Sequence, residues 1–208
     1  MTIFFNYIFM KKRIHSLLWF IACIAQAVAQ VQYVNPIIGT DGMGHTFPGA
    51  CVPFGIVQLS PDTDTIPHNL DGVYQKKVYE YCAGYRYNDP TIVGFSHTHF
   101  NGTGHSDLGD ILIMPTTGEL KLNPGTADHP EDGYRSRFSH HTEKAVPGYY
   151  EVMLDDYQVK AQLTATTRVG IHRYIFPEGD QTGQRGNQRS NTADVDANQQ
   201  IPIILRKL

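Results

Sequence analysis

The chain has 208 residues, of which 41% are hydrophobic and 18% are charged, a balance typical of a globular domain with a buried core. Its formal net charge of −3 supplies no basic surface, which argues against nucleic acid or an anionic membrane as a partner. The many tyrosines and phenylalanines favour strands, where aromatic side chains pack well.

The N-terminus has the pattern of a secretory signal peptide. A basic cluster at 11–13 precedes an apolar run at 17–24, and small residues at 27–29 match a signal-peptidase site. We therefore expect residues 1–29 to be removed during export to the periplasm or the medium, and the apolar run is too short to span a bilayer. Met10 is an alternative start codon, and Cys23 is an alternative lipoprotein attachment site, although apolar residues continue past it.

Beyond the signal peptide, glycine and proline dominate residues 39–53, which excludes a helix there. Residues 54–59 then predict a short buried strand that is ended by the sequence at 60–62. The apolar run at 111–114 is bounded by Asp110 and a proline, and its length fits a strand buried on both faces.

The clearest strands come later in the chain. Apolar and polar residues alternate at 151–155 and again at 159–166, and a turn at 155–158 joins them into a hairpin with one buried face. Residues 169–176 predict a third strand, and a shift in its apolar phase near His172 predicts a bulge. Because no window shows a sustained 3.6-residue apolar period, we predict an all-β domain, an antiparallel β-sandwich over residues 30–176.

The C-terminal residues 177–208 predict a polar, disordered tail. Up to position 200 its only large apolar residue is Val195, so it has too little apolar surface to offset the entropy cost of ordering. A strand-like apolar run then begins at 201, close to the last residue, and favours a truncated gene product. An ordinary exposed tail with an apolar end is the alternative.

Two cysteines, Cys51 and Cys82, remain after removal of the signal peptide. An exported chain allows them to form a disulfide, and two buried free thiols are the alternative. The sequence contains no Cys-x-x-Cys pair, so we do not expect a thiolate zinc site.

The segment 94–110, GFSHTHFNGTGHSDLGD, is the densest group of polar side chains in the chain. His97 and His99 would share one face if the chain there were extended. Residues 101–104 predict a tight turn because they include two glycines, and His105 and Asp107 follow. The backbone amides and short side chains of such a turn suit the hydroxyl groups of a sugar.

The residues alone allow three further interpretations of this segment. His97, His99, His105 and Asp107 are metal-ligand types, but their spacing matches no standard zinc pattern. A Ser96–His97–Asp107 triad lacks the strand-turn-helix setting of a nucleophile elbow. Histidines that only satisfy hydrogen bonds at a turn are the simplest interpretation.

Several long motifs, taken in order, resemble the N-terminal domain of glycoside hydrolase family 92, over residues 31–177. Their number and order make the resemblance specific. The motifs are NPIIGT at 35–40, GACVPFGIVQLSP at 49–61, GYRY at 84–87, the segment 94–110, PGYY at 147–150 and LTATTRVGIHRYIF at 163–176.

The resemblance implies an exo-acting, inverting α-mannosidase that requires calcium and acts on mannose-containing glycans. In such an enzyme a β-sandwich packs on an (α/α)6 barrel, which supplies most of the catalytic carboxylates and calcium ligands, while the sandwich contributes loops to the substrate pocket. We accordingly expect no catalytic residue and no metal ligand in this chain, and Asp107 and Asp110 make a poor acid/base pair. The expected substrate-binding residues are His97, His99, Asn101, Gly102, Thr103, Gly104, His105, Asp107 and Tyr85.

The sequence departs from the family pattern in two ways. The barrel, the expected intramolecular partner, is absent from these 208 residues, so we expect no mannosidase activity and no bound calcium from this chain alone. A stand-alone, non-catalytic carbohydrate-binding module and a degraded pseudogene product are the alternatives. The resemblance also implies a tryptophan shortly before the GYRY motif in α-1,2-specific members, where Tyr79 and Tyr81 occur instead, and His105 is a second candidate for setting linkage preference.

Overall fold

The computed structural model describes residues 31–177, apart from 65, 67–68 and 103–108, together with positions 13, 15 and 19 and the backbone of 199–200 and 203–204. Residues 1–35 and 36–208 form two compact units. The predicted signal peptide lies almost wholly outside the described residues. No helix within the described part of the chain is long and apolar enough to cross a membrane.

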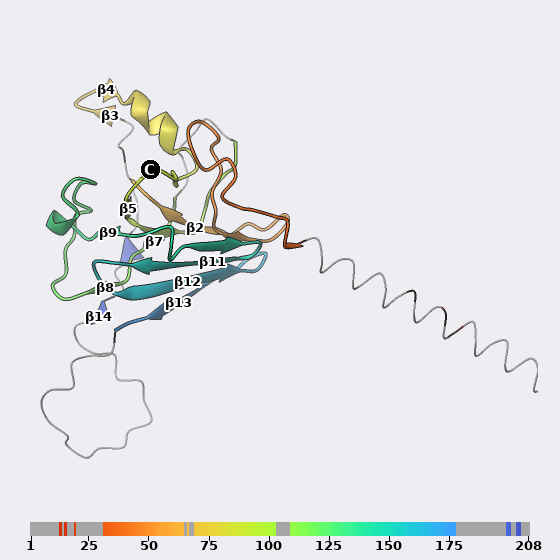
Figure 1. Ribbon diagram of the computed structural model, residues 1–208. Helices are drawn as coiled ribbons and strands as arrows, with labels where there is room; N and C mark the ends of the chain where they lie inside the picture. The colour runs from red at the N-terminus through yellow and green to blue at the C-terminus, as the bar shows by residue number, and fades with distance from the viewer. Residues whose placement is uncertain are drawn as a thin grey trace, which may run out of the picture. The chain divides into compact units, whose positions relative to one another are not determined.

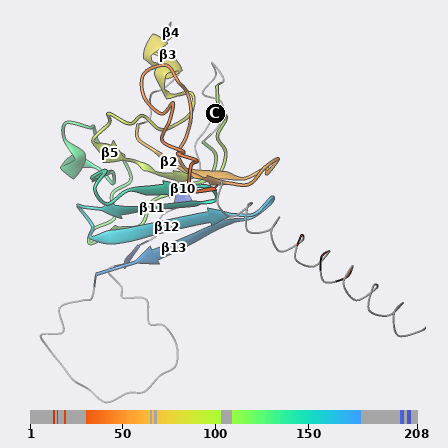
Figure 2. The same ribbon diagram turned by 45° about the vertical axis from the view of Figure 1, so that its right-hand side comes forward.

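The second unit is built from two principal antiparallel sheets, which confirms the predicted all-β class (Figures 1 and 2). One sheet has the order β1 (Ala50–Cys51), β2 (Gln58–Asp62), β6 (Gly94–Ser96), β7 (Leu112–Ile113) and β15 (Ile203–Ile204). The other sheet has the order β10 (Lys144–Val146), β11 (Tyr149–Leu154), β12 (Val159–Ala165) and β13 (Gly170–Ile175).

Shorter elements complete this unit. Three two-stranded pairs are β3 (Asn69–Leu70) with β4 (Val73–Tyr74), β5 (Thr91–Ile92) with β9 (Ser136–Arg137), and β8 (Thr116–Thr117) with β14 (Gln199–Gln200). Two 3-10 helices, η1 (Lys76–Tyr81) and η2 (Pro130–Asp132), are the helical segments among its described residues.

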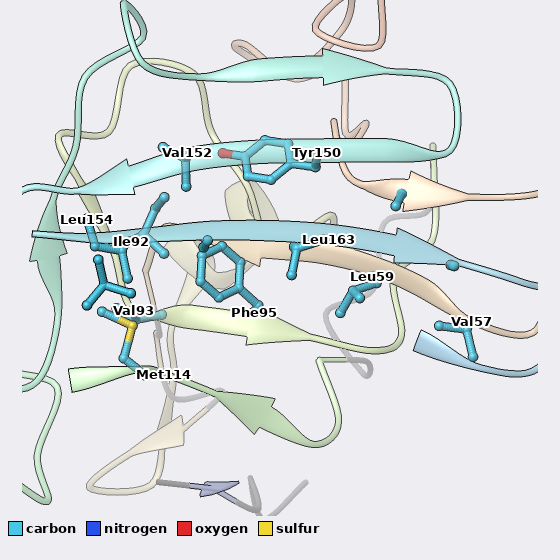
Figure 3. Packing of buried hydrophobic residues seen from close by; sticks show 14 of the residues in the cluster. Val57, Leu59, Ile92, Val93, Phe95, Met114, Tyr150, Val152, Leu154 and Leu163 are labelled. Atoms are coloured by element: carbon cyan, nitrogen blue, oxygen red, sulfur yellow. The ribbon is translucent and has the colours of Figure 1, made fainter. Parts of the chain in front are cut away.

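The core lies where the inner faces of the two principal sheets meet. Phe95 from β6 and Leu59 from β2 pack with Tyr150, Val152 and Leu163 from β11 and β12 (Figure 3). These five side chains are almost completely buried, and the aromatic rings contribute the largest apolar areas. This packing confirms the sandwich predicted from alternating strands.

The predicted hairpin is confirmed, because β11 pairs with β12 from Leu154↔Val159 to Tyr149↔Thr164. The bulge predicted near His172 is wrong. β13 pairs with β12 without interruption from Lys160↔Ile175 to Ala165↔Gly170. The inward-facing positions of β13 carry His172 and Tyr174 in place of aliphatic residues. The sequence therefore looks as if its apolar alternation were shifted by one residue, although the strand is regular.

The strand predicted at 54–59 begins later than expected, at Gln58, and continues through Asp62. Phe54 is fully exposed with φ 59°, in a turn closed by a 2.9 Å hydrogen bond from Gly55 N to Val52 O. Proline and glycine on either side of Phe54 favour this turn over a strand. Ile56 N then donates to Thr167 O at 2.8 Å, which connects the β1–β2 hairpin to the turn that follows β12.

The strand predicted at 111–114 is shorter than expected. β7 covers Leu112–Ile113, and Met114 beside it is fully buried. Ile111 is 46% exposed and has φ 54°, an unusual backbone angle for a β-branched residue. The apolar run therefore contains a turn at its first position and is not buried on both faces.

The C-terminal segment contributes two short strands, because β14 pairs with β8 and β15 pairs with β7. The predicted disorder at 178–198 lies outside the described residues. Cys51 and Cys82 do not form a disulfide with each other, and Cys82 Sγ donates to Tyr79 O at 2.7 Å. The alternative of two buried thiols is met for Cys82, which is buried, but not for Cys51, which is half-buried.

The free energy of unfolding should depend on pH through Glu151 on β11. Hydrogen bonds from Gln162 and Tyr149 lower its pKa from 4.5 to about 2. Because the folded-state pKa is the lower one, this contribution is complete above pH 4.5 and is lost as the pH falls towards 2. Urea unfolding at about pH 6 and about pH 3 should show a difference between wild type and Glu151→Gln that shrinks at the lower pH. A constant difference would contradict the assignment.

Candidate functional site

The polar segment 94–110 contains β6 and leads to β7. His97 N donates to Asp110 O at 3.1 Å, and Gly109 N donates to Thr98 O at 2.9 Å. Thr98 Oγ1 also donates to Asp110 Oδ2 at 3.1 Å. These bonds join residues 97–98 to residues 109–110, the two ends of the segment that follow β6 and precede β7. Its sequence-predicted site residues Thr103, Gly104, His105 and Asp107 lie outside the described residues.

Asn101 and Gly102 are exposed and are fixed to the glycine-rich residues 39–49, which we call the platform loop. Phe47 N donates to Asn101 Oδ1 at 3.1 Å, and Gly102 N donates to His45 O at 2.7 Å. Gly102 has φ +70°, a backbone angle that glycine adopts readily, while Gly104, the second glycine of the predicted turn, lies outside the described residues. The platform loop therefore holds one end of the polar turn.

The ring of Tyr79 lies next to the ring of His45, which belongs to the platform loop. His45 is buried, with φ 50°, and its ring meets the Tyr79 ring edge-on at a centroid distance of 4.8 Å. Its Nε2 atom is buried and has no hydrogen-bond partner among the described residues. Tyr79, on η1, is 41% exposed. Sequence reasoning missed His45, whose only local mark is a polar residue placed within a glycine-rich loop.

His99 lies in the interior, where its side chain is about as buried as that of its partner Asp62. Its Nδ1 must carry a proton, because it lies 2.7 Å from Gln58 O and a carbonyl only accepts. Its Nε2 lies 3.1 Å from Ser96 Oγ and 3.2 Å from Asp62 Oδ1. Both ring nitrogens are thus engaged inside the domain.

The His99 ring is connected to the polar turn through Phe47. It packs against the Phe47 ring at a centroid distance of 5.3 Å, and the backbone of Phe47 binds Asn101. A continuous set of contacts therefore runs from Asp62, through His99 and Phe47, to the exposed Asn101. This places His99 as a residue that positions the turn.

The alternative Ser96–His97–Asp107 triad is wrong. Ser96 is fully buried and its hydroxyl contacts His99, not His97. Asp107 lies outside the described residues. The rings of His97 and His99 have different partners, Ile111 O for His97 and Gln58 O for His99.

His97 instead pairs with His172 of β13. His97 Nδ1 lies 3.0 Å from Ile111 O, and the two Nε2 atoms lie 3.1 Å apart. His172 Nδ1 lies 2.7 Å from Tyr174 Oη. Burial, and to a smaller extent His97, lowers the pKa of His172 to about 4. Local sequence patterns do not select His172, because it lies 75 residues from its partner.

Tyr85, another predicted site residue, also faces the interior. Its hydroxyl donates to Glu143 Oε1 at 2.9 Å, and the Tyr150 hydroxyl donates to the same oxygen at 2.7 Å. His140 Nδ1 lies 2.6 Å from Glu143 Oε2, and the Glu143 side chain is only 3% exposed. Burial and the neighbouring Glu143 raise the pKa of Tyr85. Tyr85 thus joins its loop to the second sheet.

Calcium requires six to eight oxygen ligands. No group of three or more His, Cys, Asp or Glu side chains able to hold a metal occurs in the described ranges. The described residues therefore do not fit a calcium site.

Comparison with known proteins identifies relatives of this fold. The glycosyl hydrolase family 92 N-terminal domain matches residues 33–201. A family GH92 α-mannosidase from Bacteroides thetaiotaomicron, solved in complex with mannoimidazole, is 51% identical with a TM-score of 0.65, covering 72% of this chain and 18% of its own. A family GH92 inverting mannosidase from Bacteroides thetaiotaomicron VPI-5482 is 30% identical with a TM-score of 0.52, covering 72% and 18%.

A curated relative from Arthroderma benhamiae, described as an uncharacterized secreted glycosidase, is 25% identical over 184 residues, covering 84% of this chain and 19% of the relative. The chain thus spans about a fifth of the length of the relatives it matches. The family match extends over most of the chain, and the β-sandwich agrees with it. The chain therefore belongs to glycosyl hydrolase family 92, of which it contains the N-terminal domain.

Proposed function

We propose that this domain forms part of an exported α-mannosidase and supplies one wall of its pocket for mannose-containing glycans. The observation that carries the proposal is the 51% identity to an α-mannosidase solved with mannoimidazole. The basic and apolar pattern at 11–29, and the description of one relative as secreted, support export to the periplasm or medium. The catalytic carboxylates would come from another part of such an enzyme.

The polar turn and the surface beside it have the chemistry that a sugar requires. Asn101 is exposed and offers an amide group to a sugar hydroxyl. Tyr79 offers an exposed aromatic ring, which suits the apolar face of a sugar. The remaining turn residues, Thr103, Gly104, His105 and Asp107, belong to the same proposed wall.

Tyr79 is the proposed determinant of linkage preference. It occurs before the GYRY motif, where the family resemblance implies tryptophan in α-1,2-specific members. Tyr81, the other tyrosine in this stretch, is buried and its hydroxyl lies 3.3 Å from Asp89 Oδ1, so it is not available to a ligand. An α-1,2 preference would therefore depend on the ring at Tyr79 and on His105.

Calcium is proposed as the metal of the longer enzyme, with its ligands outside the described residues of this chain.

A domain exchange tests the proposed function. Residues 36–176 of this chain would replace the corresponding part of the Bacteroides thetaiotaomicron α-mannosidase that is 51% identical. The hybrid should hydrolyse an aryl α-mannoside in the presence of calcium. Asn101→Ala in the hybrid should lower kcat/KM about tenfold, because one hydrogen bond to the sugar is lost.

Asn69→Ala is the matched control, because Asn69 is also an exposed asparagine but belongs to the separate β3–β4 pair. It should leave kcat/KM unchanged. A folded hybrid without turnover would contradict the family role of the domain. Equal kcat/KM for the Asn101→Ala and Asn69→Ala hybrids would contradict the proposed wall while leaving the family role intact.

A further inference from the structure

The contact between His97 and His172 joins parts of the two principal sheets. His97 directly follows β6, and His172 occupies an inward-facing position on β13. Gly170 makes room for this contact, because a Cβ atom there would lie only 2.9 Å from Cδ2 of His97. Both histidines are partly exposed.

The outer nitrogens of both rings are already held by oxygen atoms. Ile111 O accepts from His97 Nδ1–H, which leaves the lone pair of a neutral His97 on Nε2. Tyr174 Oη lies 2.7 Å from His172 Nδ1 and can accept from it, which would place the second lone pair on Nε2 as well. Such oxygen partners commonly fix the ring orientation of metal-binding histidines.

The spacing of the two Nε2 atoms also suits a metal ion. Two nitrogens on one ion lie about 2.8 Å apart in cis positions of square-planar copper and about 3.3 Å apart in tetrahedral zinc. The observed separation of 3.1 Å lies between these values. The ring planes are inclined by 39° and the centroids lie 4.9 Å apart, closer than a collinear pair of rings would be.

We propose that His97 and His172 form a two-histidine site for a divalent transition metal, Cu²⁺ or Zn²⁺, that joins the two sheets. Among the described residues no third His, Cys, Asp or Glu completes the group, so water fills the remaining coordination positions. Imidazole nitrogen favours these two ions, whereas Ca²⁺ prefers oxygen. The site is thus separate from any calcium site of the longer enzyme.

The test is metal binding to the full 208-residue chain, measured by calorimetry with Cu²⁺ and Zn²⁺ and by electron paramagnetic resonance with Cu²⁺. The spectrum should show two imidazole nitrogens on one copper. His172→Gln should weaken binding at least about tenfold. A metal concentration about ten times the Kd should raise Tm by about 4 °C in wild type and not in the variant. Ca²⁺ should give no such shift.

His141→Gln is the matched control, because His141 is exposed and lies in the separate turn before β10. Tyr174→Phe keeps both ligands and removes the oxygen beside His172, and it should weaken binding about tenfold. A spectrum with a single imidazole nitrogen would overturn the proposal. So would equal affinity in wild type, His172→Gln and Tyr174→Phe, or loss of binding in His141→Gln alone.

Discussion

Replacing Asp62 with alanine should lower the free energy of unfolding of this domain by about 3–5 kcal/mol, because it removes the carboxylate from the buried Asp62–His99 pair. Asp62 Oδ1 lies 3.2 Å from His99 Nε2, and both side chains are almost completely buried. Without the carboxylate, the His99 ring would keep its bond to Gln58 O but lose its charged partner in the interior. Urea unfolding followed by circular dichroism measures the change.

A double-mutant cycle separates the pair from its surroundings. His99→Ala should cost a similar amount, and Asp62→Ala with His99→Ala together should cost clearly less than the sum of the two. Asp128→Ala is the control, because Asp128 is exposed, and it should change stability by less than about 0.5 kcal/mol. Strict additivity of the two single substitutions would show that Asp62 and His99 do not stabilise each other.

Gly84→Ala should be the second strongly destabilising substitution, at about 3 kcal/mol or more. Gly84 has φ +78°, and a Cβ atom there would overlap Asp62 Oδ1 and lie 3.0 Å from His99 Nε2. If Asp62 and His99 move away from the added Cβ atom, they lose the contact between Asp62 Oδ1 and His99 Nε2. The added methyl group therefore combines backbone strain with damage to the buried pair.

Gly72→Ala provides a close control for backbone strain alone. Gly72 has φ +82°, nearly the same as Gly84, but nothing lies within 4 Å of the point that a Cβ atom would occupy there. Its substitution should cost about 1–2 kcal/mol, the strain of a left-handed conformation for alanine. If Gly84→Ala and Gly72→Ala lower the free energy of unfolding by equal amounts, steric contact with Asp62 does not contribute to the cost of Gly84→Ala.

The sequence predicts the strands of the sandwich best where they are long and have one face exposed to solvent. The alternation at 149–165 is unambiguous, and the observed hairpin follows it in register. The run at 54–59 is misleading because its apolar residues have no alternation, and the turn at Phe54 depends on backbone angles that composition does not reveal. Short apolar runs that include glycine or proline are therefore poor guides to strand boundaries.

The candidate site is only partly predictable for a related reason. The turn at Asn101–Gly102 follows from local residue types. The partners of His97 and His99 do not, because His172 and Asp62 lie 75 and 37 residues away along the chain. Local spacing suggests one shared face, but the His99 ring contacts Asp62 in the interior while the His97 ring contacts His172.

The hydrogen bond from Ile56 N to Thr167 O has a consequence for how the sandwich can open. It joins the turn after β1 to the turn after β12, and these strands belong to different sheets. Fraying of either hairpin tip therefore breaks a backbone bond between the sheets, so local opening and sheet separation are coupled at this end. The amide proton of Ile56 should therefore exchange with solvent when either hairpin tip frays, which makes it a reporter of opening at this end of the sandwich.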